Sequence, residues 1–189
     1  DTTWLYDYLR IPIPQDNEKI DIGKQKFILK DGILRNQSLL TKNQAQTQAT
    51  FGFKWEKRDT YEGKATLANM RTWLLERYGD IVSADWLSEH GENPILIDAG
   101  CGAGMTTLEL FGSLLSNVRY LGIDISSAVD VAATRFEERK LRGAFMQTDI
   151  SNLPLPESSV DLVYSEGVLH HTDSTKEALQ SLARLLKKG

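Results

Sequence analysis

The chain has 189 residues, 41% of them hydrophobic and 25% charged, with a formal net charge of −4 at pH 7. These values are typical of a globular protein with one domain, or with one domain and an appendage. The acidic balance provides no overall field that would attract nucleic acid, and no apolar run approaches the about 20 residues of a membrane helix. We therefore expect neither nucleic-acid binding nor a membrane span.

Cys101 is the only cysteine, so the chain can form neither an internal disulfide nor a cysteine zinc cluster. A single thiol fits a reducing compartment, and we expect a cytoplasmic protein without a bound metal. The sequence gives no indication of an oligomeric state.

The first 60 residues are polar, and their Gln-, Asn- and Thr-rich stretch shows little periodicity. Asp31-Gly32 lies between two short apolar runs and predicts a hairpin turn, because this pair suits positive φ. We expect residues 1–60 to form an irregular N-terminal extension or small module, packed on a main domain at residues 61–189. A cap on the substrate side and a mobile segment are the alternatives.

A regular alternation of helices and strands follows. The apolar run at residues 95–97 is typical of a strand buried on both faces. Such alternation predicts an α/β fold with a Rossmann-like, doubly wound parallel sheet. The expected elements are a helix ending at Gly79, strands at 95–97, 118–124, 143–150 and 160–166, a helix around Leu108 to Leu115, a helix capped by Ser127 with Asp130, and a helix capped by Ser174 with Glu177.

Three glycines at alternate positions, Gly100, Gly102 and Gly104, follow the first strand of this predicted sheet. Ligands bind beyond the carboxyl ends of parallel strands, and glycine lets the backbone approach them closely. The spacing matches neither a Lys-containing phosphate loop nor G-x-G-x-x-G, whose third glycine would fall on Met105. Asp98 would repel a pyrophosphate here. The local chemistry therefore favours a nucleoside that carries an amino acid over a dinucleotide.

Acidic residues end the next two strands. Asp124 lies twenty residues after Gly104, where a carboxylate can accept hydrogen bonds from both ribose hydroxyls. Asp149 could accept from an adenine amino group, with Ile125 and Ile150 on either side of the ring. A surface position would also explain Asp124, and a turn or helix cap would explain Asp149 equally well.

Four stretches occur in a familiar order: residues 98–104, "GIDIS", "TDISNLPLPESSVDLVYSEGVLHH" and "ALQSLARLLKKG". Together they resemble a class I S-adenosylmethionine-dependent methyltransferase, most closely the broad "type 11" group with ubiquinone/menaquinone-biosynthesis-like enzymes. The resemblance covers residues 95–189, about half of the chain. It implies S-adenosylmethionine as cofactor, S-adenosylhomocysteine as product, and an acceptor that is an unidentified small molecule.

The resemblance also implies a cofactor-binding set. The methionine part of the cofactor would contact the glycine loop. Asp98 would either orient that loop or contact the ammonium group of the ligand. The ribose would meet Asp124, the adenine would meet Asp149, and Ser165 would lie under the cofactor near the transferring methyl. The full set is Asp98, Ala99, Gly100, Gly102, Asp124, Ile125, Asp149, Ile150 and Ser165.

Members of this family usually continue past "LLKKG" with three further strands, which complete a sheet of seven. The resemblance therefore implies a sheet truncated after the fourth strand, with that strand as an exposed apolar edge. We expect such a fragment to bind cofactor weakly and to lack activity on its own.

Two other functions stay open at this point. A nicotinamide oxidoreductase would share the acidic residue after the second strand, but the glycine spacing and Asp98 disfavour it. A non-catalytic binding or scaffold domain would keep the same fold. The intact cofactor motifs argue against a scaffold, whereas the missing strands argue for it.

No catalytic residue is identified, because methyl transfer from a sulfonium mainly requires positioning of the nucleophile and exclusion of water. A general base is needed only where the nucleophile must lose a proton. His170 and His171 follow the fourth strand and are the candidates. This pair recurs in family members with unlike substrates, which favours a structural role in the loop.

If the histidines have that structural role, His171→Ala leaves the affinity for S-adenosylhomocysteine unchanged, because the imidazole is not among the expected cofactor contacts. Isothermal titration calorimetry measures this directly. A large loss of affinity in the variant would contradict the interpretation.

Overall fold

The computed structural model describes residues 2–38, 40–56, 63–84 and 87–188. The strands are β1 (Lys19–Ile22), β2 (Gln25–Lys30), β3 (Ile33–Asn36), β4 (Ile95–Ala99), β5 (Arg119–Asp124), β6 (Gly143–Gln147) and β7 (Leu162–Tyr164). The helices are α1 (Trp4–Leu9), α2 (Lys42–Glu56), α4 (Lys64–Tyr78), α5 (Met105–Phe111), α6 (Ala128–Glu138) and α7 (Thr175–Ala183). Short 3₁₀ helices lie at Ser88–His90, Gly112–Asn117, Ile150–Asn152 and Leu169–His171.

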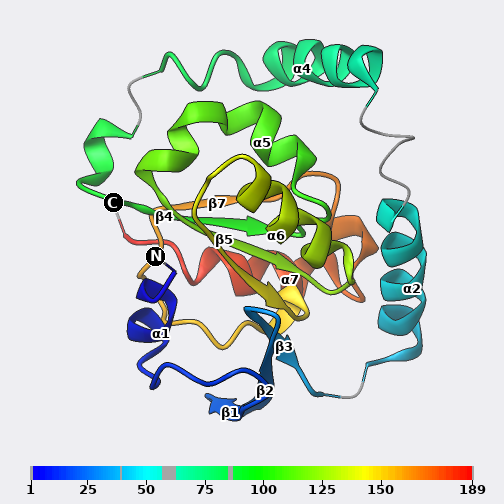
Figure 1. The fold of residues 1–189 in the computed structure, drawn as a ribbon, viewed down its shortest axis with the longest axis vertical. Coiled ribbons are helices and arrows are strands. Elements are labelled where there is room, and N and C mark those ends of the chain that lie inside the picture. The colour runs from blue at the N-terminus through cyan, green and yellow to red at the C-terminus, as the bar shows by residue number, and fades with distance from the viewer. Residues whose placement is uncertain (1, 39, 57–62, 85–86, 189) are drawn as a thin grey trace.

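The seven strands form one sheet in the order β1-β2-β3-β6-β5-β4-β7 (Figure 1). The pairs from β3 to β7 are parallel, whereas β1, β2 and β3 form an antiparallel meander. The predicted α/β fold with a mostly parallel sheet is therefore confirmed. The hairpin is confirmed too, since Asp31 and Gly32 join β2 to β3 with φ of 53° and 74°.

Two expectations about the N-terminal half and the sheet are wrong. The described part of residues 1–60 is not irregular, because it contains α1, three strands and α2. The sheet is not limited to four strands, since β3 pairs with β6 in the register Leu34 to Met146 and adds the meander to it. Periodicity within residues 1–60 could not reveal a pairing with a strand so distant in sequence. The domain boundary at residues 60 and 61 lies outside the described residues and stays a prediction.

Helices cover both faces of the sheet and bury an apolar core on each. Leu5 of α1 and Leu182 of α7 pack on one face, together with the β4 residue Ile97. Leu74 of α4 packs on the other face with residues of α5 and α6. In Figure 1, α4 and α5 lie above the strands and α7 below them. All residues of β4 are buried, as its continuous apolar run predicted.

One helix cap agrees with the sequence and one does not. The Ser174 hydroxyl accepts the Glu177 N–H at 3.3 Å and caps α7, as expected. The Ser127 side chain makes no capping hydrogen bond at α6. Asp130 instead forms an ion pair with Arg35 of β3 at 2.6 Å, so the carboxylate links the meander to α6. A capping pattern was the wrong interpretation because a long-range partner competes for Asp130.

β7 is an edge strand of the sheet, as the sequence predicted. The crossover between β6 and β7 holds only the short 3₁₀ helix Ile150–Asn152, followed by an extended segment, which confirms the expected irregular connection. Whether the chain is a fragment stays a prediction.

The position of β3 predicts that the meander and the parallel strands unfold together. Leu34 is 1% exposed and lies in the shared core, so Leu34→Ala should lower the free energy of unfolding by about 2–5 kcal/mol. Urea denaturation of the variant should show a single transition, with its midpoint at a lower urea concentration than in the unchanged protein.

The matched control is Leu40→Ala, because Leu40 is 38% exposed, and its effect should stay below about 0.5 kcal/mol. Two separate transitions, with only one of them moved by Leu34→Ala, would show instead that the N-terminal segment is an independent module.

Candidate functional site

A cleft lies at the carboxyl ends of the parallel strands. Its wall contains the predicted residues Gly100 and Gly102 after β4, Asp124 and Ile125 after β5, and Asp149 and Ile150 after β6. In Figure 1, α2 stands at the end of the sheet toward which the arrows of β4 and β5 point. Three strand ends, separated in sequence, thus contribute to one cavity.

The glycine loop after β4 is tied to the end of β5. The N–H groups of Gly100 and Cys101 both donate to the Ile123 carbonyl, at 2.7 and 3.0 Å. Gly100 has φ of +84°, and a Cβ there would overlap with the side chain of Val168. Glycine is therefore required at position 100 both by the backbone angle and by the close approach of the segment after β7.

Asp124 connects this loop to the cleft. Its Oδ2 accepts the Gly102 N–H at 2.8 Å, and its Oδ1 accepts the N–H and the hydroxyl of Ser126 at 2.8 and 2.6 Å. Burial raises the pKa of Asp124, and these three hydrogen bonds act in the opposite direction. A carboxylate offers about four acceptor positions, so one position on Oδ2 remains for a ligand.

Asp98 lies behind the cleft wall. It is 2% exposed, and its Oδ2 accepts hydrogen bonds from the Thr107 hydroxyl of α5 and, at 2.8 Å, from the Tyr120 hydroxyl of β5. Burial raises its pKa from the ordinary 3.8 to about 6. Of the two roles expected for Asp98, these contacts favour orientation of the loop and of α5.

Ala99 and Ser165 are also not in the cleft wall. The Ser165 hydroxyl donates to the Ala99 carbonyl at 2.8 Å, which joins the end of β4 to the segment after β7. Their side chains support the wall from behind, and the contact of Ser165 with a cofactor stays a prediction. The Cys101 thiol is buried, and burial raises its pKa, so it is suited to packing rather than to nucleophilic attack.

Asp149 has the capping role that the sequence left open, and it also lines the cleft. Its Oδ1 accepts the Ser151 N–H at 3.0 Å, which caps the short helix after β6. Its Oδ2 accepts a hydrogen bond from the side-chain amide of Gln44 at 2.9 Å. The same carboxylate lines the cleft, so a cap and a ligand contact are compatible.

The segment after β7 supplies a side of the cleft that the sequence reasoning largely missed. Glu166, Gly167 and Val168 line it, followed by residues 171–173. Glu166 ends the predicted strand at 160–166, and the rule that singled out Asp124 and Asp149 at strand ends would have found it. Of the two histidines, His171 lines the cleft, and His170 does not.

Two further wall residues, Gln44 and Thr47, come from α2. They lie in the stretch that we expected to be irregular. The signal available there was Thr41-x-x-Gln44, a capping-box pattern, and the structure shows both of its hydrogen bonds.

The described residues contain no group of three or more His, Cys, Asp or Glu side chains placed to hold a metal ion. No helix in the described part of the chain has the length and hydropathy to cross a membrane.

Comparison with known families identifies a methyltransferase domain at residues 97–189. An uncharacterized methyltransferase from Mycobacterium tuberculosis is 33% identical over 96 residues, covering 50% of this chain and 46% of the relative. An O-methyltransferase from Aspergillus nomiae is 28% identical over 97 residues, which cover 50% of this chain and 42% of that protein. The chain thus spans less than half the length of these curated relatives.

Among solved structures, magnesium protoporphyrin IX methyltransferase from Synechocystis with bound S-adenosylmethionine has a TM-score of 0.52. It is 19% identical, and the match covers 79% of this chain and 74% of that one. Geranyl diphosphate C-methyltransferase from Streptomyces coelicolor has a TM-score of 0.52 at 18% identity, and the match covers 80% of this chain and 63% of that one. At these identities the likeness concerns the fold.

The raised pKa of Asp98 predicts a pH-dependent stability. Between about pH 4 and pH 6 the folded chain holds a proton on Asp98 that the unfolded chain has lost, so stability falls as the pH rises through this window. The difference corresponds to about 3 kcal/mol. Asp98→Asn removes the ionisation and keeps an acceptor oxygen for Thr107 and Tyr120.

We expect the free energy of unfolding of Asp98→Asn, relative to the unchanged protein, to rise by up to about 3 kcal/mol from pH 4 to pH 7. Urea denaturation at a series of pH values measures it. A difference that does not vary with pH would show that Asp98 titrates like an exposed carboxyl group.

Proposed function

This chain belongs to the class I S-adenosylmethionine-dependent methyltransferase family, and we propose that it binds S-adenosylmethionine and transfers its methyl group to a small-molecule acceptor. The observation that supports this most is the convergence of Gly100, Gly102, Asp124 and Asp149 on one cleft. These residues come from three strands, and each is of the type that the family's cofactor motifs use.

The charges of the cleft suit this cofactor. Four carboxylates line it, those of Asp124, Asp149, Glu166 and Asp173, and no Lys or Arg does so among the described residues. Such a wall attracts a ligand with a sulfonium and an ammonium group and repels a pyrophosphate. It therefore also weighs against a nicotinamide dinucleotide.

Each part of the cofactor has a complementary place. The remaining acceptor position of Asp124 would hold one ribose hydroxyl, and a second bond would require the Ser126 hydroxyl to turn away. Asp149 would accept from the adenine amino group between Ile125 and Ile150. The methionine part would lie against the loop of Gly100 and Gly102. Asp98, Ala99 and Ser165 would hold that loop in place.

The bound cofactor supplies an already activated methyl group, so the protein's task is positioning. The acceptor would approach from the side of residues 166–173, which the cofactor contacts assigned above leave open. His171 lines this side and is the candidate base for an acceptor that must lose a proton. A cytoplasmic location is part of this proposal, supported by the lone buried thiol of Cys101.

Calorimetry with S-adenosylhomocysteine and with NAD tests the proposal. We expect the former to bind and the latter not to. Asp124→Ala should weaken the binding about 10- to 100-fold, because a charge-assisted hydrogen bond is lost and the glycine loop loses an anchor. Circular dichroism checks that the variant is folded.

Asp21→Ala is the matched control, since Asp21 is exposed on β1 and outside the cleft, and it should bind normally. Binding of NAD without binding of S-adenosylhomocysteine would contradict the proposal. Binding of S-adenosylhomocysteine without methyl transfer to any acceptor in a panel would leave the scaffold alternative open, because a fragment is expected to lack activity on its own.

A further inference from the structure

α2 approaches the cleft through one polar face. Gln44 and Gln48 lie one helical turn apart, and Gly52 follows after another turn. The Gln44 amide donates to Asp149, and the Gln48 amide donates to the Ile125 carbonyl at 3.0 Å. Gly52 is buried, and a Cβ there would lie 2.8 Å from the Ser127 hydroxyl. This face therefore rests on the segments that follow β5 and β6.

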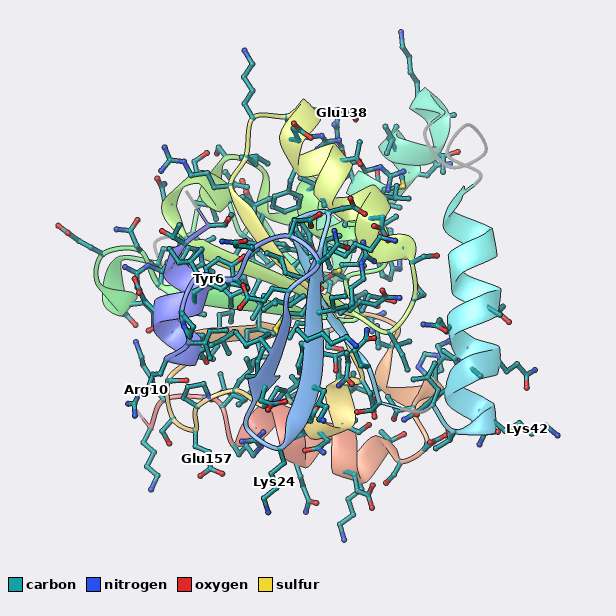
Figure 2. All side chains as sticks on the ribbon, turned by 60° about the horizontal axis from the view of Figure 1, so that its bottom comes forward. Tyr6, Arg10, Lys24, Lys42, Glu138 and Glu157 are labelled. Carbon is teal, nitrogen blue, oxygen red and sulfur yellow. The ribbon has the colours of Figure 1, made fainter. Side chains whose placement is uncertain are left out.

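The start of α2 is also tied to the opposite side of the cleft. The Thr41 hydroxyl donates to Asp173 at 2.9 Å, and Asp173 lies on the segment after β7. A chain of hydrogen bonds thus connects Asp173 through Thr41 and Gln44 to Asp149. All of these residues except Thr41 line the cleft. In Figure 2, Lys42 at the first turn of α2 points away from the rest of the molecule. The face of α2 that carries Lys42 is therefore in solvent, and the face with Gln44 is turned to the cleft.

The orientation of the Gln44 amide is determined by its partners. Its Oε1 accepts the Thr41 N–H at 2.9 Å, so its NH₂ group must be the one that faces Asp149. The other oxygen of Asp149 accepts the Ser151 N–H. Donors on both oxygens fix the plane of the carboxylate, while its remaining acceptor positions stay free.

We propose that α2 closes over the bound cofactor, and that Gln44 is a positioning residue that holds the Asp149 carboxylate for the adenine amino group. This rests on the proposed function. Gln44 and Thr47 line the cleft, so a bound cofactor contacts α2 as well as the sheet. Binding of the cofactor and docking of the helix then stabilise each other.

The composition of the first part of α2 fits a helix that opens and closes at this end. Residues 42–50 contain no large apolar side chain. Their contacts with the strand ends are hydrogen bonds, each of which exchanges readily with water. An apolar interface would hold this part of the helix shut, whereas these hydrogen bonds would let the cofactor enter and leave.

A double-mutant cycle tests the role of Gln44. In calorimetry with S-adenosylhomocysteine, Gln44→Ala should weaken binding about 3- to 10-fold. In an Asp149→Ala background the same change should cause no further loss, because its effect runs through that carboxylate. Gln46→Ala is the matched control, since Gln46 is an exposed glutamine on the same helix, and it should bind normally.

A second ligand separates positioning from simple packing. S-inosylhomocysteine carries a carbonyl where adenine has its amino group. The unchanged protein should prefer S-adenosylhomocysteine, and Gln44→Ala should reduce this preference. An equal loss for both ligands, or additive losses in the cycle, would overturn the role of Gln44.

Hydrogen–deuterium exchange tests the closing of α2. Amides of residues 45–52 should exchange more slowly when S-adenosylhomocysteine is bound, and unchanged exchange would overturn this part of the proposal. Failure of the unchanged protein to bind S-adenosylhomocysteine would overturn the proposed function together with this inference. Normal binding with no effect of Gln44→Ala would overturn the inference alone.

Discussion

The hydrogen bond from the Gly102 N–H to the Asp124 carboxylate joins the loop after β4 to the end of β5, and the cleft depends on it. The loop can reach Asp124 because the N–H groups of Gly100 and Cys101 are already held by the Ile123 carbonyl. The N–H and the hydroxyl of Ser126 donate to the other carboxylate oxygen, which leaves one acceptor position on Oδ2 of Asp124 for a ligand. One side chain thus shapes the loop and offers a binding group.

Negative charge is concentrated at this end of the sheet, at a cost to stability. Asp98 is ionised above about pH 6 although it is buried, and Asp124 shares the upward shift of pKa that burial causes. A cationic ligand would relieve this accumulation of charge, so the electrostatics of the cleft favour its binding. The hydrogen bonds from Thr107 and Tyr120 to Asp98 hold the glycine loop after β4 and α5 in place.

The sequence predicted the residues whose signals are local. Gly100, Asp124 and Asp149 lie at or just after the ends of apolar strands, and the structure brings them to one cleft. The hairpin between β2 and β3 was predicted, but the position of the meander in the sheet was not, because it depends on the pairing of β3 with β6. Asp130 was misinterpreted because its partner, Arg35, is distant in the sequence. α2 resembled a loop because its residues 42–50 are mostly polar and lack an apolar stripe, and Gln44 and Gln48 attach it to the strand ends through hydrogen bonds.

A crystal structure of the chain with S-adenosylhomocysteine is the most direct measurement of the central claim, that the strand ends and α2 together form a cofactor site. The account predicts the ribose against Asp124, the adenine amino group against Asp149, and Gln44 still donating to that carboxylate. Electron density for the ligand elsewhere on the chain, or an adenine that contacts neither carboxylate, would contradict it.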